Sequence, residues 1–292
     1  MVIIVLLSLF FINWRSRLGN KRADLLQLWE TGVYDKAFAL SGELLEDKPM
    51  DYFLLMVHGF SSYQLGIAQI NSLDTQSYID AAIWSLRKAL LVGDTADGRL
   101  QYVLGKAYHS KGFGYADLAV KYLEEAKAAA CDANDIPEYL GLSYALLRDY
   151  RSSVAAFSLA LNPAGVMGGV SNAEQPPPDL LLLSIAHSYI ELGELSTARA
   201  YLIHCVDTSR DSKKVVTARL LLGDILRKSG EVQEAETQYL TILSEDGENA
   251  EAHFQLGELY AGAGDTTRAR AEWRKAFRLD PAHRPARERL NL

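Results

Sequence analysis

Residues 250–281 read AEAHFQLGELYAGAGDTTRARAEWRKAFRLDP and contain a regularly spaced set of small and bulky residues. Leu256 and Gly257 stand together, Tyr260 follows, and Gly264 lies in the middle of the stretch. The second half carries, in order, Ala269, Trp273, Ala276 and Pro281. Apolar positions recur every three or four residues on both sides of Gly264, which predicts two amphipathic helices joined at a glycine.

The same set of residues occurs again 34 positions earlier, in register and without a gap, as Leu222, Gly223, Gly230, Ala235 and Tyr239. Extending the register gives seven units, which start at Leu18, Tyr52, Gly98, Asn134, Asp179, Val216 and Ala250. This unit resembles the tetratricopeptide repeat, a 34-residue helix-turn-helix with Leu-Gly, Tyr, Ala, an aromatic residue and Pro at fixed places. The resemblance implies an all-α protein, a right-handed superhelical solenoid of about seven such repeats, with almost no β-structure.

Small and large residues alternate at matching positions of the units. The first helix carries a small residue in all units but the first, at Leu25, Gly59, Gly105, Gly141, Ala186, Gly223 and Gly257. The second helix carries a larger residue, again except in the first unit, at Ser41, Leu86, Leu123, Phe157, Leu202, Tyr239 and Trp273. Small residues thus meet large ones at each turn, so that the helices can interdigitate.

A glycine is expected to close the first helix of each unit in a left-handed C-cap. The candidates are Gly32, Gly66, Gly112, Gly193, Gly230 and Gly264, with Arg148 as the exception. The first unit is atypical, as expected of a terminal repeat. An insertion around residues 69–80 of the second unit predicts either longer helices or a projecting loop.

The pattern divides the chain into an apolar start, two blocks of repeats, a loop and a cap. Triple proline interrupts the helical pattern between the blocks, because proline cannot continue a helix. The predicted segments are a membrane anchor at 1–17, repeats one to four at 18–167, a Gly/Pro-rich loop at 168–178, repeats five to seven at 179–283, and a C-terminal cap at 284–292.

The N-terminal segment is apolar from Met1 to Ile12 apart from Ser8, and Trp14 and several basic residues follow. An interfacial aromatic residue with a basic flank is typical of a membrane anchor and places the repeats in the cytoplasm. As a helix, however, Met1 to Trp14 would span only about 21 Å, against a hydrocarbon core of about 30 Å. A helix packed on the first repeat therefore remains an alternative, as does an extracytoplasmic location if the true start lies upstream.

Composition excludes two broad classes of protein. With 49% apolar residues the chain is too hydrophobic to be disordered. A net charge of −7 argues against nucleic-acid binding, which needs a concentrated surplus of Lys and Arg. The two cysteines, Cys131 and Cys205, fall two repeats apart, too far for a disulfide, and Cys205 holds a position that suits a buried thiol.

The residue spacings that catalysis or metal binding needs are missing. No two of the six histidines stand four residues apart with a third ligand nearby, which argues against zinc. The short glycine motifs at Gly112 and at Gly262 to Gly264 fall in predicted repeat turns and follow no strand, which argues against nucleotide binding. We therefore predict a protein that is not an enzyme and holds no cofactor and no metal.

In tetratricopeptide proteins the first helices of successive repeats line a concave groove, and the resemblance identifies the positions that face it. The predicted partner-binding residues are Phe53, Met56, Phe60, Tyr63, Arg99, Tyr102, Lys106, His109, Leu142, Leu183, His187, Ile190, Leu220, Arg227 and Phe254. Family members that clamp a C-terminal carboxylate use Lys and Asn in this groove, and the corresponding positions hold no Asn. The set is mainly aromatic and aliphatic, which suits an amphipathic helix or an apolar peptide.

The predicted function is a scaffold or adaptor, tethered at a membrane, that binds an apolar or amphipathic segment of another protein. Two alternatives remain open, a self-assembling structural protein and a binder of a small apolar ligand. The groove could also be covered by the N-terminal segment, by residues 162–178 or by a second copy of the chain.

Overall fold

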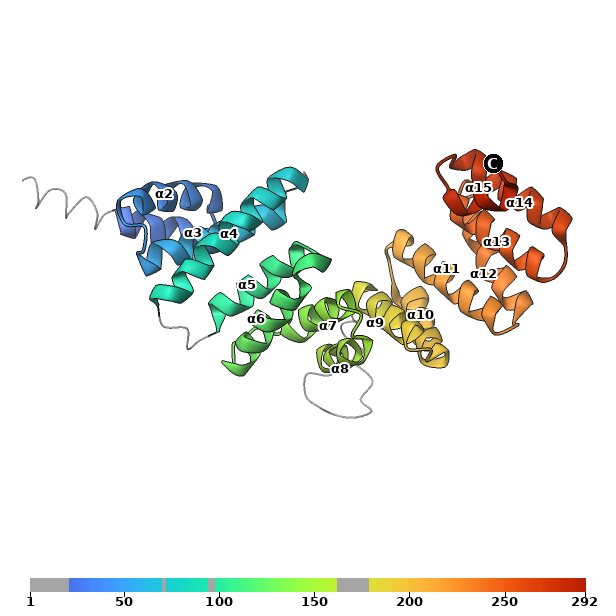
Figure 1. Cartoon of the computed structure of the whole chain (residues 1–292), viewed down its shortest axis with the longest axis horizontal. Coiled ribbons are helices and arrows are strands. Elements are labelled where there is room, and N and C mark those ends of the chain that lie inside the picture. Colours follow the sequence, from blue (N-terminus) through green and yellow to red (C-terminus); the bar gives the residue numbers. More distant parts are fainter. Residues whose placement is uncertain (1–20, 70–71, 94–97, 162–178) are drawn as a thin grey trace, which may run out of the picture. The chain divides into compact units, whose positions relative to one another are not determined.

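The computed structural model describes residues 21–69, 72–93, 98–161 and 179–292. Within these ranges the regular elements are helices and none is a strand. Consecutive helices pack against each other within each of the two compact units of the chain (Figure 1). The predicted all-α helical-repeat fold is therefore confirmed.

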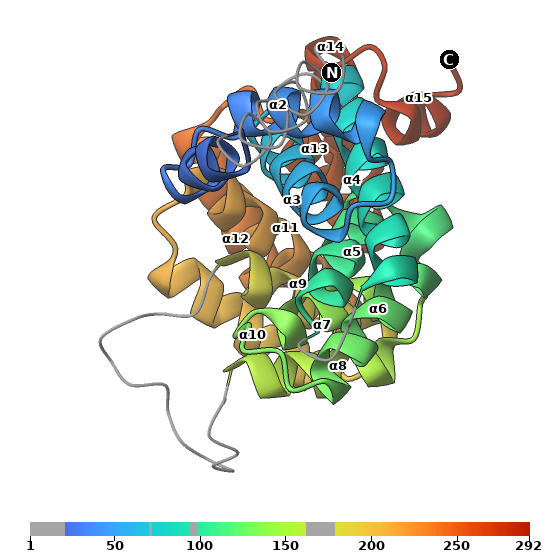
Figure 2. The same cartoon turned by 90° about the vertical axis from the view of Figure 1, so that its left-hand side faces the viewer.

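The chain forms two compact units, and the first ends at Asp149. Its elements are a helix over residues 21–30, α2 (Tyr34–Asp47), α3 (Tyr52–Ala68), α4 (Ser72–Val92), α5 (Arg99–Ser110), a 3-10 turn (Phe113–Tyr115), α6 (Ala116–Ala128) and α7 (Ile136–Leu146). Helix α3 packs against α2, α4 and α5, and Figure 2 shows it next to α2 and α4. The first helices of successive repeats thus lie beside each other within this unit.

The second unit begins at Tyr150. Its elements are α8 (Tyr150–Leu161), α9 (Asp179–Glu191), α10 (Leu195–Thr208), α11 (Ser212–Lys228), α12 (Val232–Glu245), α13 (Ala250–Gly262), α14 (Thr266–Leu279) and α15 (Arg284–Leu290). Each helix packs on the next, and α11 also contacts α9 and α13. This is the same arrangement of first helices as in the first unit.

Four glycines at the small position, in the second, third, sixth and seventh repeats, lie against the bulky residue of their own repeat. A Cβ added to Gly105 would lie 2.5 Å from Leu123 Cγ, and one added to Gly223 would lie 2.5 Å from Tyr239 Cε1. The same is true of Gly59 against Leu86 and of Gly257 against Trp273. These distances leave no room for a side chain, so the two helices of a pair approach closely only because the residue is glycine.

The C-cap prediction holds except at Gly66 and at Gly112, whose φ of 83° is positive but whose ψ of −160° lies outside the left-handed helical region. The other candidate glycines have positive φ, and Arg148 adopts the same conformation, with φ of 60°. Gly66, in contrast, lies inside α3, where a Cβ would meet Ile79 Cδ1 at 3.0 Å. The insertion is the reason, because α3 continues to Ala68 and α4 begins at Ser72. Gly66 therefore lies where these two long helices contact each other.

A half-buried histidine joins three helices of the first unit. The Nδ1 atom of His58 lies 2.8 Å from the hydroxyl of Ser85, and its ring centroid lies 4.5 Å from that of Phe38. Burial lowers the pKa of His58 from 6.5 to about 4, because the charged imidazolium is poorly solvated there. Burial lowers the pKa of His109 as well. Both rings are therefore neutral in the folded protein at pH 7.

Stability is expected to fall on mild acidification. The unfolded chain binds a proton at His58 near pH 6.5 and the folded chain near pH 4, so stability is fully present above pH 6.5 and is lost toward pH 4. After allowance for partial exposure, we expect a loss of about 1–2 kcal/mol between pH 7 and pH 5 in urea unfolding. His58→Asn should reduce this loss, whereas His204→Asn, at an exposed site, should not. An unchanged pH dependence in His58→Asn would contradict the assignment.

The predicted membrane localisation needs correction. Over the part of the chain that the structure describes, no helix combines the length and the apolar character needed to cross a bilayer. The apolar segment at 1–17, on which the prediction was based, lies outside the described residues. The loop at 168–178 also lies outside them. The membrane anchor and the cytoplasmic placement derived from it are therefore not retained.

Candidate functional site

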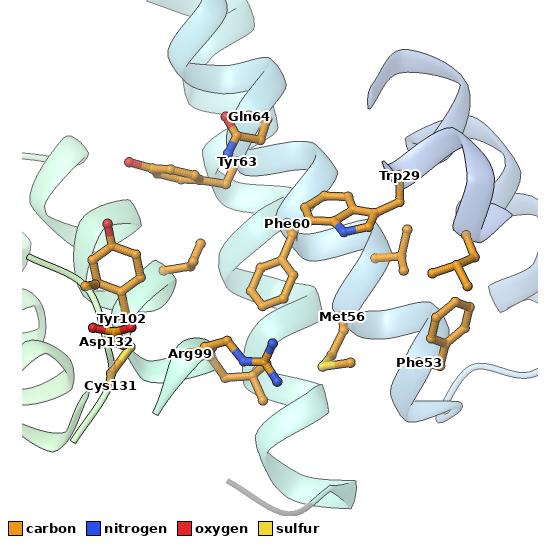
Figure 3. Close-up of a pocket in the computed structure, with 15 residues that line it drawn as sticks. Trp29, Phe53, Met56, Phe60, Tyr63, Gln64, Arg99, Tyr102, Cys131 and Asp132 are labelled. Carbon is orange, nitrogen blue, oxygen red and sulfur yellow. The ribbon is translucent and has the colours of Figure 1, made fainter. Parts of the chain in front are cut away.

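The first unit contains an open cavity of about 520 Å³ (Figure 3). Its walls come from the helix at 21–30, from α3 and α5, and from the loop that follows α6. The lining residues are Leu26, Trp29, Phe53, Met56, Val57, Phe60, Tyr63, Gln64, Arg99, Leu100, Tyr102, Val103, Cys131, Asp132 and Ala133. The cavity thus lies on the first helices of three successive repeats.

One side of the cavity is aromatic and aliphatic. Phe53, Met56 and Phe60 stand three and four residues apart, so they share one face of α3. The ring of Trp29 packs beside Phe60, with centroids 5.9 Å apart and planes inclined by 35°. Asp51 fixes the start of α3, since its carboxylate accepts a hydrogen bond from the Leu54 amide at 3.2 Å. A capped, rigid helix therefore presents this apolar face.

The opposite side is polar and is held together by one carboxylate. Asp135 accepts a hydrogen bond from the Tyr102 hydroxyl at 2.7 Å and another from the Lys106 ammonium at 2.8 Å. Lys106 also donates to the Tyr102 hydroxyl at 3.0 Å and lies 4.3 Å from the ring centroid of Tyr139. These contacts fix the position of the Tyr102 ring at the cavity wall.

The ionisation of this network follows from its contacts. Burial acts to lower the pKa of Lys106, but its hydrogen bonds to Asp135 and Tyr102 outweigh this effect and raise it above its usual value. Burial, and the acceptor Asp135, raise the pKa of Tyr102 to about 12. At neutral pH Lys106 is therefore charged and Tyr102 is protonated.

The last wall is formed by backbone geometry after α6. Ala130 has φ of 53°, and the amide of Cys131 donates to the carbonyl of Ala126 at 3.0 Å, which closes the helix in a left-handed cap. This turn brings Cys131, Asp132 and Ala133 to the edge of the cavity.

Six of the predicted groove residues line this cavity, namely Phe53, Met56, Phe60, Tyr63, Arg99 and Tyr102. Lys106 and His109 lie further along α5 and contact the fourth repeat, where His109 Nδ1 is 3.1 Å from the Ser143 hydroxyl. Leu142 is half-buried on α7. Six of the predicted groove positions therefore coincide with the cavity, and the partner-binding role of all the predicted residues stays a prediction.

The other predicted residues belong to the second unit. Leu183, Ile190 and Leu220 are half-buried against its core. His187 is exposed near Tyr150, with ring centroids 6.3 Å apart, and Arg227 forms an ion pair with Asp224. Phe254 is only 9% exposed and lies next to His283, at the start of α15.

Leu26 and Trp29 are cavity residues that the sequence prediction missed. They hold the ninth and twelfth places of the first repeat, which are the places of Phe60 and Tyr63 in the second. The same template would have found them, but the first repeat was treated as a degenerate cap. No sequence signal could have indicated Cys131 to Ala133, because their position depends on the cap at Ala130.

The described residues form no candidate metal site. Within the ranges that the structure covers, no three His, Cys, Asp or Glu side chains are placed to hold a metal ion. What the cavity provides is apolar surface with a polar network at one end, which is the composition of a binding site for an apolar or amphipathic ligand.

Comparison with known proteins supports the repeat assignment. The tetratricopeptide repeat family matches residues 183–246 and 220–284, so the second unit contains tetratricopeptide repeats over 183–284. The chain matches no curated protein sequence.

Solved structures of repeat proteins share the fold over most of the chain. The C-terminal part of a TPR repeat-containing protein from Cytophaga hutchinsonii is 13% identical with a TM-score of 0.63, covering 92% of this chain and 99% of that one. PilF from Pseudomonas aeruginosa is 17% identical with a TM-score of 0.57, covering 80% and 96%. YrrB, described as a TPR protein with an unusual peptide-binding site, is 20% identical with a TM-score of 0.53, covering 71% and 98%. At these identities the likeness establishes the fold alone.

Proposed function

We propose that this protein is a non-catalytic adaptor that binds an amphipathic helix of a partner protein in the cavity of its first unit. The observation that carries the proposal is the open apolar cavity on the first helices of adjacent repeats, where Phe53, Met56 and Phe60 face Trp29 and Tyr102. Tetratricopeptide solenoids use this concave side of the array for binding. Aromatic residues in such a cavity are suitable anchors for apolar side chains of a partner.

The chain itself supports a helix as the ligand. Helix α15 packs against the seventh repeat through Glu251, Phe254 and Glu258, which hold the second, fifth and ninth places of that repeat. In the second repeat the same places hold Phe53, Met56 and Phe60. The positions that line the cavity are therefore ones on which a helix is seated elsewhere in this protein.

Selection of peptides tests the proposal. The probe is a library of 18-residue helical peptides with Leu at positions i, i+3, i+4 and i+7 and with Lys, Glu or Ala elsewhere, presented to the full chain. We expect a selected peptide to slow alkylation of Cys131, which lines the cavity, by about tenfold or more at saturation. Cys205 is fully buried and provides an internal control, since its alkylation reports unfolding only.

Three outcomes would contradict the proposal. The first is that no peptide is enriched, and the second is that enriched peptides leave the alkylation of Cys131 unchanged. The third is a dimer of the full chain that shields Cys131 and dissociates in Met56→Glu, which would identify a second copy as the occupant.

A further inference from the structure

Helix α15 shows how a basic side chain is held by the second, fifth and ninth places of a repeat, which in the seventh repeat are Glu251, Phe254 and Glu258. The guanidinium of Arg289 donates two hydrogen bonds to Glu258, at 2.8 Å and 2.6 Å. The Glu258 side chain is only 14% exposed and that of Arg289 is 55% exposed, so a largely buried carboxylate holds a partly exposed cation. At the other end of the helix, the imidazole of His283 lies 3.0 Å from the Glu251 carboxylate. The helix is thus seated with the Arg289 guanidinium and the His283 ring on carboxylates that flank Phe254.

The first unit has a comparable carboxylate, but without a cation. Glu138 holds the fifth place of the fourth repeat and is half-buried on the first turn of α7. Among the described residues it makes no hydrogen bond and no ion pair. Lys106, the cation whose charge acts on it, is bound to Asp135 and Tyr102. Glu138 is therefore a partly shielded carboxylate that the described chain leaves without a cation.

The surroundings of Glu138 favour an approaching positive charge. Burial raises the pKa of Glu138, and the negative charge of Asp135, one turn earlier, raises it further. A second acidic group, Asp132, lies at the edge of the cavity. A cation that pairs with a partly desolvated carboxylate gains a charge-assisted hydrogen bond and removes the cost of leaving that charge unpaired.

The position of Glu138 also connects it to the cavity. Tyr102 lines the cavity and donates to Asp135, and Glu138 follows Asp135 by one helical turn. A Lys or Arg side chain has a long flexible stem, so its charged end can reach beyond the apolar face that carries it. Glu138 is thus separated from a residue of the cavity wall by one hydrogen bond and one helical turn.

We infer that the helix bound in this cavity carries a Lys or Arg side chain that pairs with Glu138, next to the apolar residues that fill the cavity. This inference rests on the proposed function and specifies the chemistry of the partner as a basic amphipathic helix.

The peptide library tests the inference by charge reversal. Peptides selected on the full wild-type chain should share a Lys at one fixed distance from their Leu residues. Replacing this Lys by Ala should weaken binding about tenfold, the scale of one charge-assisted hydrogen bond, and Glu138→Gln should abolish the difference. Glu138→Lys should select Glu at the same place. Glu125→Gln, at an exposed site on α6, removes a charge of the same sign and should leave the preference unchanged.

The outcomes separate the two proposals. Peptides that protect Cys131 but show no preference for Lys, or whose preference survives Glu138→Gln, would overturn the basic partner and leave the proposed function intact. Absence of any peptide that protects Cys131 would overturn both.

Discussion

Replacing Gly257 by alanine is expected to destabilise the protein by about 2–3 kcal/mol, a large effect for the addition of one methyl group. A Cβ at this position would lie 2.5 Å from Trp273 Cδ1, 2.6 Å from Trp273 Nε1 and 3.1 Å from the carbonyl oxygen of Ala269. The Trp273 ring is itself only 9% exposed, and Ala269 and Ala276 on the same helix are fully buried. Neither the ring nor the backbone can move away cheaply. Urea unfolding followed by circular dichroism measures the loss.

Helix α13, which carries Gly257, also supplies the matched control. Gly262, at the end of α13, has nothing within 4 Å of an added Cβ, so Gly262→Ala should be neutral or stabilise by up to about 1 kcal/mol. In a Trp273→Leu background, which removes the ring, Gly257→Ala should cost at least about 1 kcal/mol less than in the wild type. Equal effects at Gly257 and Gly262 would contradict close packing of Gly257 against the Trp273 ring. A cost that does not depend on Trp273 would contradict it as well.

This pairing of small and large residues could be predicted because it depends on local spacing alone. Gly105 and Leu123, for example, belong to one helix pair, and the repeat fixes how the two helices face each other. Gly66 shows the limit of such reasoning. The repeat template ended the helix there, whereas the inserted residues extended both helices and converted the same glycine into an interhelical contact.

The cavity was less predictable, since it depends on side-chain choices between repeats. The positions of Phe53, Met56 and Phe60 followed from the template. The template could not show that Lys106 would bind Asp135, a residue 29 positions away. Because of this contact Lys106 does not line the cavity. Nor could it show that α15 would cover Phe254 at the other end of the chain. Both outcomes reflect contacts between elements that no single repeat encodes.

Met56→Glu is expected to weaken the binding of a selected helical peptide by about 100-fold, equivalent to about 3 kcal/mol. Met56 lies between Phe53 and Phe60 on the cavity face of α3 and is only half-buried. A carboxylate there stays hydrated in the free protein, so the fold should persist, but it must lose water against the apolar face of a bound peptide. Fluorescence anisotropy of a labelled peptide measures the affinity, and circular dichroism checks that the helices remain.

Two further variants distinguish loss of the cavity from a general effect of charge. Leu91→Glu makes the same change in charge on α4 of the same unit, where Leu91 is 80% exposed and does not line the cavity, and should leave the affinity unchanged. Met56→Leu keeps the volume and the apolar surface and should bind within a few-fold of the wild type. Because a folded Met56→Glu protein differs from the wild type at one wall of the cavity, undiminished binding would show that the peptide is held elsewhere. An equal loss in Leu91→Glu would show that net charge, and not burial against Met56, determines the affinity.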